Sequence, residues 1–310
     1  MSVFTIEAGL AILGLVLLLL EAFKPDISRR TLGLTAIAGT ALAFVLLLVV
    51  RHDAASLPSF MQPWHQIDTL ALFYKGFALV ITLLVLWLTL ECAPYLTRFT
   101  VDGKLAEMFS LPLIVCAGMM WMASARDLVT VFVALELVTV SFYVLVAFAR
   151  KSAFSLEAGV KYLILGALST GVLVYGIAWI YGATGTLDIT EIAKVAGNGI
   201  VNKTILTFGI VFIVAGLAFK LGAVPFHMWI PDVYQGAPTA VTVLVAGAPK
   251  LAAFAITIRL LVEGMSGLAV DWQQMLIVLA VASMTLGNLA AIAQSNLKRM
   301  LAYSTISQMG

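Results

Sequence analysis

Long runs of apolar residues recur along the chain and are separated by short polar connections. A helix needs about 20 such residues to cross the roughly 30 Å hydrocarbon core of a bilayer. The pattern therefore predicts nine spanning helices, at residues 3–23, 31–50, 68–92, 105–123, 127–149, 154–181, 204–229, 239–262 and 272–295.

A tenth predicted helix begins near Arg299 and stops at Gly310. A helix of this length rises only about 18 Å, which is too short to cross a bilayer. We therefore expect the natural protein to continue beyond Gly310 with several more spans.

The connection between the sixth and seventh spans reads LDITEIAKVAGN and predicts a short surface helix. Ile189, Ile192 and Val195 fall on one face of that helix, and Asp188 and Glu191 have the spacing of a capping box. An amphipathic segment of this kind is expected to lie along the membrane surface in a structural role.

The seventh span is interrupted by the stretch GLAFKLGAVPFHMWIPDVYQGAPTAVTVLVAGAPK, residues 216–250. A proline has no backbone donor and cannot continue a regular helix, and this stretch contains four: Pro225, Pro231, Pro238 and Pro249. We predict a broken helix seven, with a simple kink as the alternative. Non-helical backbone at membrane depth is tolerated only where protein buries it or where it lines a wet cavity.

Composition supports a membrane protein. The chain is 62% hydrophobic and 11% charged, with a mean hydropathy of +1.06, whereas soluble domains are about 25% charged. The fold class is therefore all-α, a polytopic transmembrane helical bundle. The net charge of +2 is too small to suggest a nucleic-acid partner. Cys92 and Cys116 lack the spacing of metal ligands and are expected to be buried free thiols.

The distribution of basic residues predicts the orientation. Excess Lys and Arg marks the cytoplasmic side. If the N-terminus is extracytoplasmic, the inner connections hold Lys24, Arg29, Arg30, Arg98, Lys104, Arg150, Lys151, Lys298 and Arg299. The outer connections then hold Arg51, Arg126, Lys194 and Lys203. The first ten residues, MSVFTIEAGL, have no basic region, so we expect the first apolar run to be a retained helix rather than a signal peptide.

Two opposite charges lie inside the fifth and sixth predicted spans, at Glu136 and Lys161. A lone charge at the bilayer centre costs about 2.5–3.5 kcal/mol on insertion scales. Because the connection between these helices is short, they should be antiparallel neighbours. We expect Glu136 and Lys161 to face one another as an ion pair, either as part of an ion pathway or as a static structural pair.

Lys220 and Lys250 have no obvious carboxylate partner in their own helices. A lysine that is removed from water releases its proton more readily than one in water, which suits proton exchange. His227 lies between the two lysines, and an imidazole suits a proton relay. The alternative for His227 is a hydrogen-bonded packing residue.

Four other charged residues are expected to have simpler roles. Lys75 is expected to extend its amine to the outer surface. Arg259, close to Glu263, is expected to anchor its helix at the interface. Asp232 is expected to cap a turn, with the lining of a polar entry as the alternative. The sequence shows no Gly-rich phosphate loop, metal-ligand cluster or nucleophile arrangement, so we expect this chain to bind no nucleotide, metal or redox centre.

Four segments resemble the antiporter-like membrane subunits of respiratory complex I. They are FKLGAVPFHMWIPDVYQGAP, LEAGVKYLILGALSTG, ALELVTVSFYVLVAF and GNLAAIAQSNLKRMLAYSTISQMG. The segment PFHMWIPDVYQGAP is more similar to the corresponding sequence of subunit N of the proton-translocating NADH:quinone oxidoreductase than to those of subunits M or L. The resemblance runs from roughly Asp68 to Gly310.

The resemblance implies a fold of about fourteen helices, with two inverted five-helix repeats and a broken helix in each. On this basis residues 1–104 are three N-terminal helices, residues 105–262 the first antiporter-like repeat, and residues 263–310 the start of the following helices. The second broken helix would lie beyond Gly310.

The resemblance also implies roles for single residues. Glu136 matches the helix-five glutamate that couples to a neighbouring subunit, and Lys161 matches the lysine that pairs with it. Lys220 matches the lysine of the broken helix, and His227 and Lys250 match connecting residues along the central polar axis. Together these five residues would form part of a proton pathway.

The implied function is proton translocation as a subunit of NADH:quinone oxidoreductase, in a bacterial inner membrane. NADH, flavin, iron–sulfur clusters and quinone would be bound by other subunits. The partners would be the neighbouring membrane subunits and lipid, with no nucleic acid. The alternatives are a subunit of a monovalent cation/proton antiporter complex, which uses the same charges, and a purely structural membrane subunit.

Overall fold

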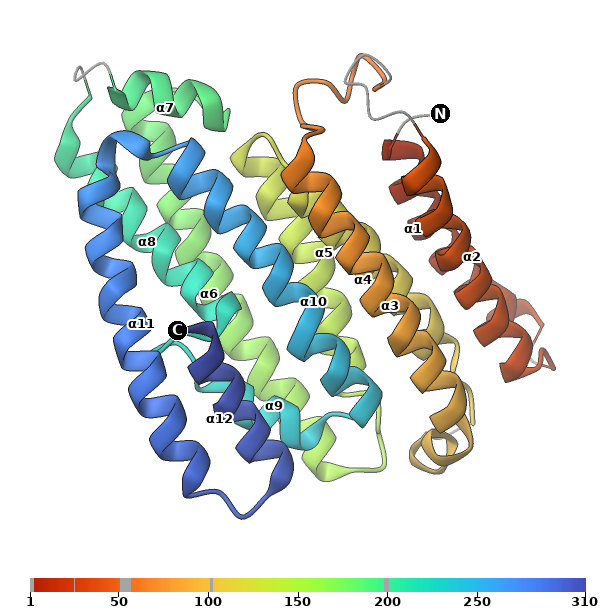
Figure 1. Ribbon diagram of the computed structural model, residues 1–310. Coiled ribbons are helices and arrows are strands. Elements are labelled where there is room, and N and C mark those ends of the chain that lie inside the picture. Colours follow the sequence, from red (N-terminus) through yellow and green to blue (C-terminus); the bar gives the residue numbers. More distant parts are fainter. Residues whose placement is uncertain (1–2, 25, 51–56, 101–102, 198–200) are drawn as a thin grey trace.

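The computed structural model describes residues 3–24, 26–50, 57–100, 103–197 and 201–310. Long helices pack side by side with their axes roughly parallel (Figure 1). Among the described residues, nine helices are long and apolar enough to cross a membrane. The predicted fold class, a polytopic helical bundle, is therefore confirmed.

Three helices form the N-terminal part of the bundle: α1 (Val3–Phe23), α2 (Arg29–Val49) and α3 (Thr69–Leu96). Helix α1 begins and ends at the predicted residues. Ser28 and Asp68 cap α2 and α3 by accepting hydrogen bonds from backbone N–H groups in the first turn, which satisfies donors that a helix start leaves free.

The centre of the bundle is α4 (Ala106–Ala123), which packs against α1, α3, α5 and α10. A Cβ atom added at Gly14 of α1 would lie 2.9 Å from the carbonyl oxygen of Ser110, and one added at Gly118 would lie 2.8 Å from Val138 of α5. Glycines therefore allow α4 to approach both neighbours closely, as small residues do at membrane-helix interfaces. This packing joins the N-terminal helices to the rest, and the predicted division at residue 104 stays a prediction.

The next helices surround the predicted break: α5 (Leu128–Val146), α6 (Ala153–Thr184), α8 (Lys203–Leu221), α9 (Trp229–Gly236) and α10 (Thr239–Thr257). The broken helix is confirmed, because α8 ends at Leu221 and the next residue, Gly222, has a positive φ of 79°, as is common after a helix end. Ser283 accepts a hydrogen bond from the Val224 N–H at 2.8 Å, and Trp229 donates one to the Phe219 carbonyl at 2.9 Å. Side chains thus satisfy backbone groups that the break leaves free.

The C-terminal part consists of α11 (Ala269–Ile292) and α12 (Leu297–Met309), which pack against each other. Helix α12 also packs against α9 and reaches about the middle of the bundle in Figure 1. The predicted surface helix is present as α7 (Ile189–Gly197), and Asp188 caps it by accepting from the backbone N–H groups of Thr190 and Glu191.

The connections α1–α2, α3–α4, α5–α6 and α11–α12 lie at one end of the bundle, which we call the basic face, while α7 lies at the opposite end (Figure 1). The basic face holds the nine basic residues assigned above to inner connections. Arg126, Lys194 and Lys203 belong to the opposite end, and Arg51 lies outside the described residues. The predicted orientation of the N-terminus in the membrane stays a prediction.

Candidate functional site

Lys220 lies in the last turn of α8, immediately before the break. Its ammonium group donates a hydrogen bond to the Thr139 hydroxyl of α5 at 3.1 Å. Thr139 in turn donates to the Leu135 carbonyl at 2.6 Å. Lys220 is partly buried. Its ammonium group contacts a neutral hydroxyl and forms no salt bridge with a carboxylate among the described residues.

Glu136 lies three residues before Thr139, so the two side chains share one face of α5. The Glu136 carboxylate accepts a hydrogen bond from the Thr170 hydroxyl of α6 at 2.7 Å. Three helices thus bring a carboxylate, two hydroxyl groups and an ammonium group together in the interior.

A small cavity of about 30 Å³ lies beside Lys220. Thr139, Tyr162, Lys220 and Pro249 contribute to its lining, so it extends from α5 toward α10. One water molecule needs about 10–15 Å³ of such volume and at least two polar partners. The cavity is therefore large enough for water next to the Lys220 ammonium group.

Lys250 of α10 is only 2% exposed, and its ammonium group makes no hydrogen bond to any described residue. It lies 5.6 Å from the ring centroid of Tyr234, within the range of a cation–π contact. Pro249, which precedes it, lines the cavity beside Lys220 and cannot donate to the carbonyl of Val245. The cavity beside Lys220 thus reaches the turn of α10 that holds Lys250, although most of the side chains that line it are apolar.

His227 lies in the turn between α8 and α9, between Lys220 and Lys250 along the chain. Its Nδ1 atom is buried and has no hydrogen-bond partner among the described residues. The break therefore holds an imidazole next to the Pro225 backbone.

The expected ion pair between Glu136 and Lys161 is wrong. Lys161 contacts Glu157 at 2.8 Å and Asp232 at 2.9 Å, and its side chain is 44% exposed. Nine residues separate Lys161 from Thr170, the partner of Glu136 on α6, and at 3.6 residues per turn they fall on opposite faces of that helix. The short connection predicted the neighbouring helices correctly but not which face of α6 turns toward α5.

The capping role expected for Asp232 is also wrong. Asp232 lies inside the first turn of α9 and bridges Lys161 of α6 and Arg299 of α12, at 2.9 and 2.7 Å. Partial burial raises the pKa of Asp232, but the hydrogen bonds from these two cations outweigh it and hold the pKa below its ordinary value. Asp232 therefore ties three helices together near the basic face.

Sequence reasoning missed a buried charge cluster in the N-terminal helices, formed by Glu7, Lys75 and His65. The Lys75 ammonium group lies 2.7 Å from the Glu7 carboxylate and 3.2 Å from the His65 imidazole. Burial, and then the charges of Lys75 and Arg259, lowers the pKa of His65 to about 3, so the imidazole is neutral. Lys75 is 0% exposed, and the expectation that it reaches the surface is wrong because a carboxylate on α1 pairs with it.

Arg259 is also buried, at 1% exposure, so the interfacial anchor expected there is wrong. Its guanidinium group binds both carboxylate oxygens of Asp68, at 2.7 and 2.8 Å, and the Ala123 carbonyl at 2.9 Å. The expected neighbour Glu263 is a more distant contact at 3.4 Å. Arg259, in the π-helical turn Ile258–Glu263 that follows α10, thus links this turn to the start of α3 and the end of α4.

Comparison with known proteins gives a consistent result. Residues 125–310 match the family described as NADH:quinone oxidoreductase/Mrp antiporter, transmembrane. The chain is 50% identical over 307 residues to NADH-quinone oxidoreductase subunit N of Herminiimonas arsenicoxydans, which covers 98% of this chain and 61% of the relative. It is 46% identical over 310 residues to the subunit of the same name from Azoarcus sp. (strain BH72), with 99% and 61% covered.

Among solved structures, the fold is similar to a chain of respiratory complex I from Thermus thermophilus with bound aureothin. The TM-score is 0.79 at 30% identity, and the match covers 98% of this chain and 62% of the other. The chain thus spans about three fifths of the length of the relatives that it matches.

Proposed function

The chain belongs to the NADH:quinone oxidoreductase/Mrp antiporter transmembrane family, and from this premise we propose that the complete protein is a proton-translocating subunit of a NADH:quinone oxidoreductase. The names of the relatives, NADH-quinone oxidoreductase subunit N, support the complex. The activity, partners and substrates of that complex are part of the proposal.

The observation that carries the proposal is the environment of Lys220. Its ammonium group contacts a neutral hydroxyl and borders a cavity large enough for water. Removal from water favours the neutral form of a lysine, whereas a negative charge at nearby Glu136 favours the ammonium form. A lysine in this position can release its proton to water and take up another when nearby charges change.

The groups around Lys220 suggest how a proton could move from it toward Lys250. A change of charge at Glu136, one helical turn from Thr139, would alter the proton affinity of Lys220 through the electrostatic interaction between them. Protons would then move through transient water toward Lys250, with His227 as a relay at the break. Lys161, held by Asp232 near the basic face, would serve at the entrance of this path rather than as the partner of Glu136.

We assign no redox reaction to this chain. In the proposed complex, other subunits bind NADH, flavin, iron–sulfur clusters and quinone, and electron transfer there drives the charge changes here. The partners would be neighbouring membrane subunits and lipid, in a bacterial inner membrane with the basic face toward the cytoplasm. The excess of basic residues on that face supports this orientation.

The test is Lys220→Ala in the full-length subunit within its complex, reconstituted in sealed vesicles. We expect the rate of proton transfer through this path to fall by on the order of 10²-fold, since positioned proton-transfer groups typically contribute at least that much. The number of protons translocated per electron should fall with it. The amount of assembled complex should stay normal, because the substitution removes a costly intramembrane charge.

The matched control is Lys203→Ala, at the other end of the same helix, where the side chain is 71% exposed and pairs with Asp271. It should translocate protons like the parent. Normal coupling in Lys220→Ala would refute the proposed path, and dependence of translocation on Na⁺ would instead favour cation/proton exchange.

A further inference from the structure

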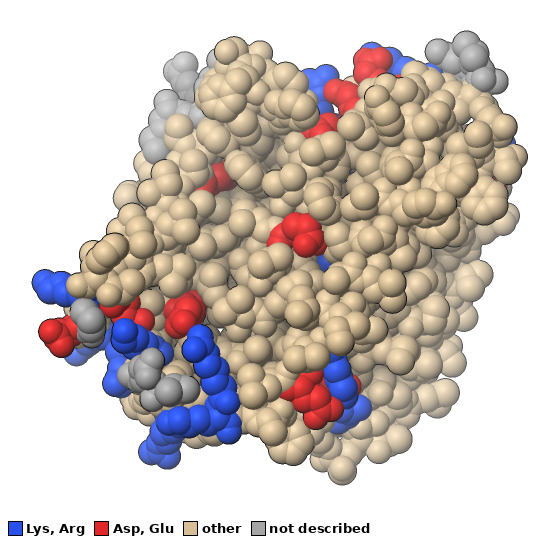
Figure 2. Space-filling model, turned by 180° about the vertical axis from the view of Figure 1, so that it is seen from behind, with Lys and Arg blue, Asp and Glu red and all other residues tan. Residues whose placement is uncertain are grey.

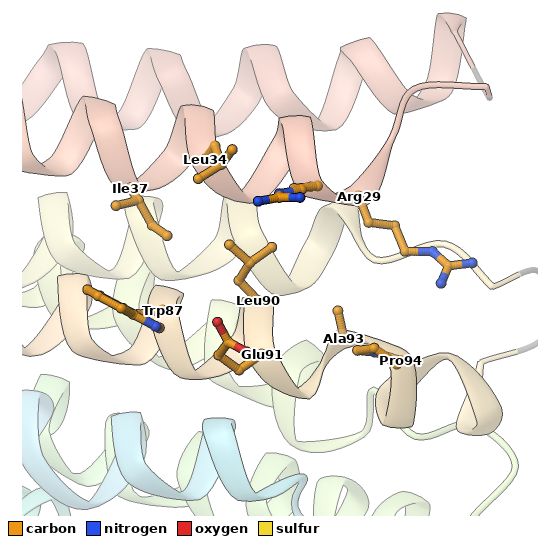
Figure 3. A pocket seen from close by; sticks show the side chains of 9 residues that line it. Arg29, Leu34, Ile37, Trp87, Leu90, Glu91, Ala93 and Pro94 are labelled. Carbon is orange, nitrogen blue, oxygen red and sulfur yellow. The ribbon is translucent and has the colours of Figure 1, made fainter.

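A groove of about 570 Å³ runs between α2 and α3 on the outer side of the bundle, away from the proposed proton path. Figure 3 shows Leu34 and Ile37 of α2 facing Leu90 and Glu91 of α3 across it, while Arg29 extends past the start of α2. Its lining combines two arginines and one glutamate with apolar side chains; the residues are Arg29, Arg30, Leu34, Ile37, Trp87, Leu90, Glu91, Ala93 and Pro94.

The groove changes from polar to apolar along its length. Arg29 and Arg30 are the first two residues of α2, at the basic face. Ile37 lies eight residues further on, which places it about 12 Å deeper along the helix axis. A phospholipid has the same order of groups, with a charged headgroup at the membrane boundary and acyl chains below it.

Charge at the mouth of the groove favours an anion. Both arginines are exposed, and neither has a carboxylate within 4.0 Å among the described residues. In Figure 3 the Arg29 guanidinium group points away from Glu91. Both arginines stand at the N-terminus of α2, where the helix dipole adds positive potential. Lys and Arg side chains gather at the lower left of Figure 2, with Asp and Glu side chains among them.

Glu91 restricts the choice of headgroup. Its carboxylate would repel a bare phosphate, but it accepts hydrogen bonds from hydroxyl groups. A headgroup with one phosphate and free hydroxyls suits this lining, because the phosphate can bind the two arginines and the hydroxyls can donate to Glu91. A phosphatidylglycerol headgroup has this composition, whereas a choline headgroup is zwitterionic and has no hydroxyl donor.

We propose that the groove between α2 and α3 binds one anionic phospholipid of the phosphatidylglycerol type. The phosphate is held by Arg29 and Arg30, the glycerol hydroxyls donate to Glu91, and an acyl chain lies along Leu34 and Ile37. Basic pockets between transmembrane helices are known to suit anionic headgroups. This site depends on the membrane fold and is independent of the proton path.

The experiment uses the full-length subunit in its complex, stripped of lipid in detergent and titrated with dioleoyl phosphatidylglycerol or dioleoyl phosphatidylcholine. Bound lipid is counted by native mass spectrometry. Each basic residue near a membrane surface contributes about 1 kcal/mol toward anionic lipid, so two arginines should favour phosphatidylglycerol by roughly tenfold or more. The Arg29→Gln/Arg30→Gln double variant should lose this preference.

Two further variants separate the groove from general surface charge. Arg98→Gln removes another exposed arginine of the basic face that does not line the groove, and it should keep the preference. Leu34→Trp should fill the groove and reduce the binding of both lipids at this site.

Equal affinity of the parent for the two lipids would overturn the proposal, as would an unchanged preference in the double variant. The proposal would also be overturned if a crosslinker on Leu34→Cys captured a neighbouring protein subunit rather than lipid.

Discussion

Two fully buried lysines, Lys75 of α3 and Lys250 of α10, have opposite surroundings. Lys75 is 0% exposed and lies 2.7 Å from the Glu7 carboxylate, with the neutral His65 imidazole at 3.2 Å. Lys250 is 2% exposed, and its ammonium group has no hydrogen-bond partner among the described residues. At similar burial, the positive charge of Lys75 is therefore paired with a carboxylate, whereas that of Lys250 is not paired with one among the described residues.

This difference separates a structural charge from one that can change. In a buried ion pair each member stabilises the charged form of the other, and removing either one leaves the other unpaired in a low-dielectric interior. A buried lysine without a carboxylate has no such constraint, and its neutral form is favoured by burial. Lys220, bonded to a hydroxyl beside a cavity, resembles Lys250 in this respect.

The comparison predicts the largest change in stability at Lys75. Lys75→Met leaves the Glu7 carboxylate buried without a cation, so the free energy of unfolding should fall by about 3–5 kcal/mol. The midpoint of thermal unfolding in detergent, and the yield of assembled complex, would both report this loss.

The double variant Glu7→Gln/Lys75→Met is the control, because it removes both charges together. Replacing a whole buried ion pair is often close to neutral, so most of the stability should return. If the double variant is as unstable as Lys75→Met alone, the pair does not account for the loss.

A smaller change of opposite sign is expected at Lys250. Lys250→Met removes a buried polar group that makes no hydrogen bond to any described residue, and such groups cost about 1–3 kcal/mol. The variant should therefore unfold at the same temperature as the parent or at a higher one, while proton translocation fails. A clear fall in the unfolding temperature would mean that Lys250 has a partner with a structural role.

The smallest effect is expected in the charge cluster near the basic face. Asp232→Asn weakens its contacts with Lys161 and Arg299, but these side chains are 29–44% exposed, and such pairs contribute less than about 1 kcal/mol. Because the pKa of Asp232 is lowered in the folded state, the contribution is present at neutral pH and is lost as the pH falls through that lowered pKa. Unfolding temperatures of parent and variant should therefore differ at pH 7 and converge in acid; a difference that persists in acid would point to packing instead of charge.

The sequence predicted the helices better than their mutual rotation. Spans could be located because a bilayer requires long apolar runs, and α1 was placed at its observed residues. The break after α8 could be predicted because Pro225 and Pro231 cannot continue a regular helix there. Positions of elements therefore follow from local rules.

Charge pairing could not be predicted in the same way. Membrane helices have apolar residues on faces that meet lipid as well as on faces that meet protein, so apolar periodicity does not show which face meets which neighbour. Glu7 and Lys75 pair across 68 positions of the sequence, and Lys161 turns to Asp232 instead of Glu136. A survey of every intramembrane charge would have drawn attention to Glu7, but its partner depends on tertiary packing.

The most direct test of the difference between the two lysines is the same substitution at both. Arginine keeps the positive charge but does not deprotonate in proteins, so it removes proton exchange alone. Protons translocated per electron would be measured in sealed vesicles for Lys250→Arg and Lys75→Arg, each in the full-length subunit within its assembled complex. We predict that Lys250→Arg loses translocation and Lys75→Arg keeps the ratio of the parent. Full translocation by Lys250→Arg, or its loss in a stably assembled Lys75→Arg, would contradict the assignment of exchange to the unpaired lysine and structure to the paired one.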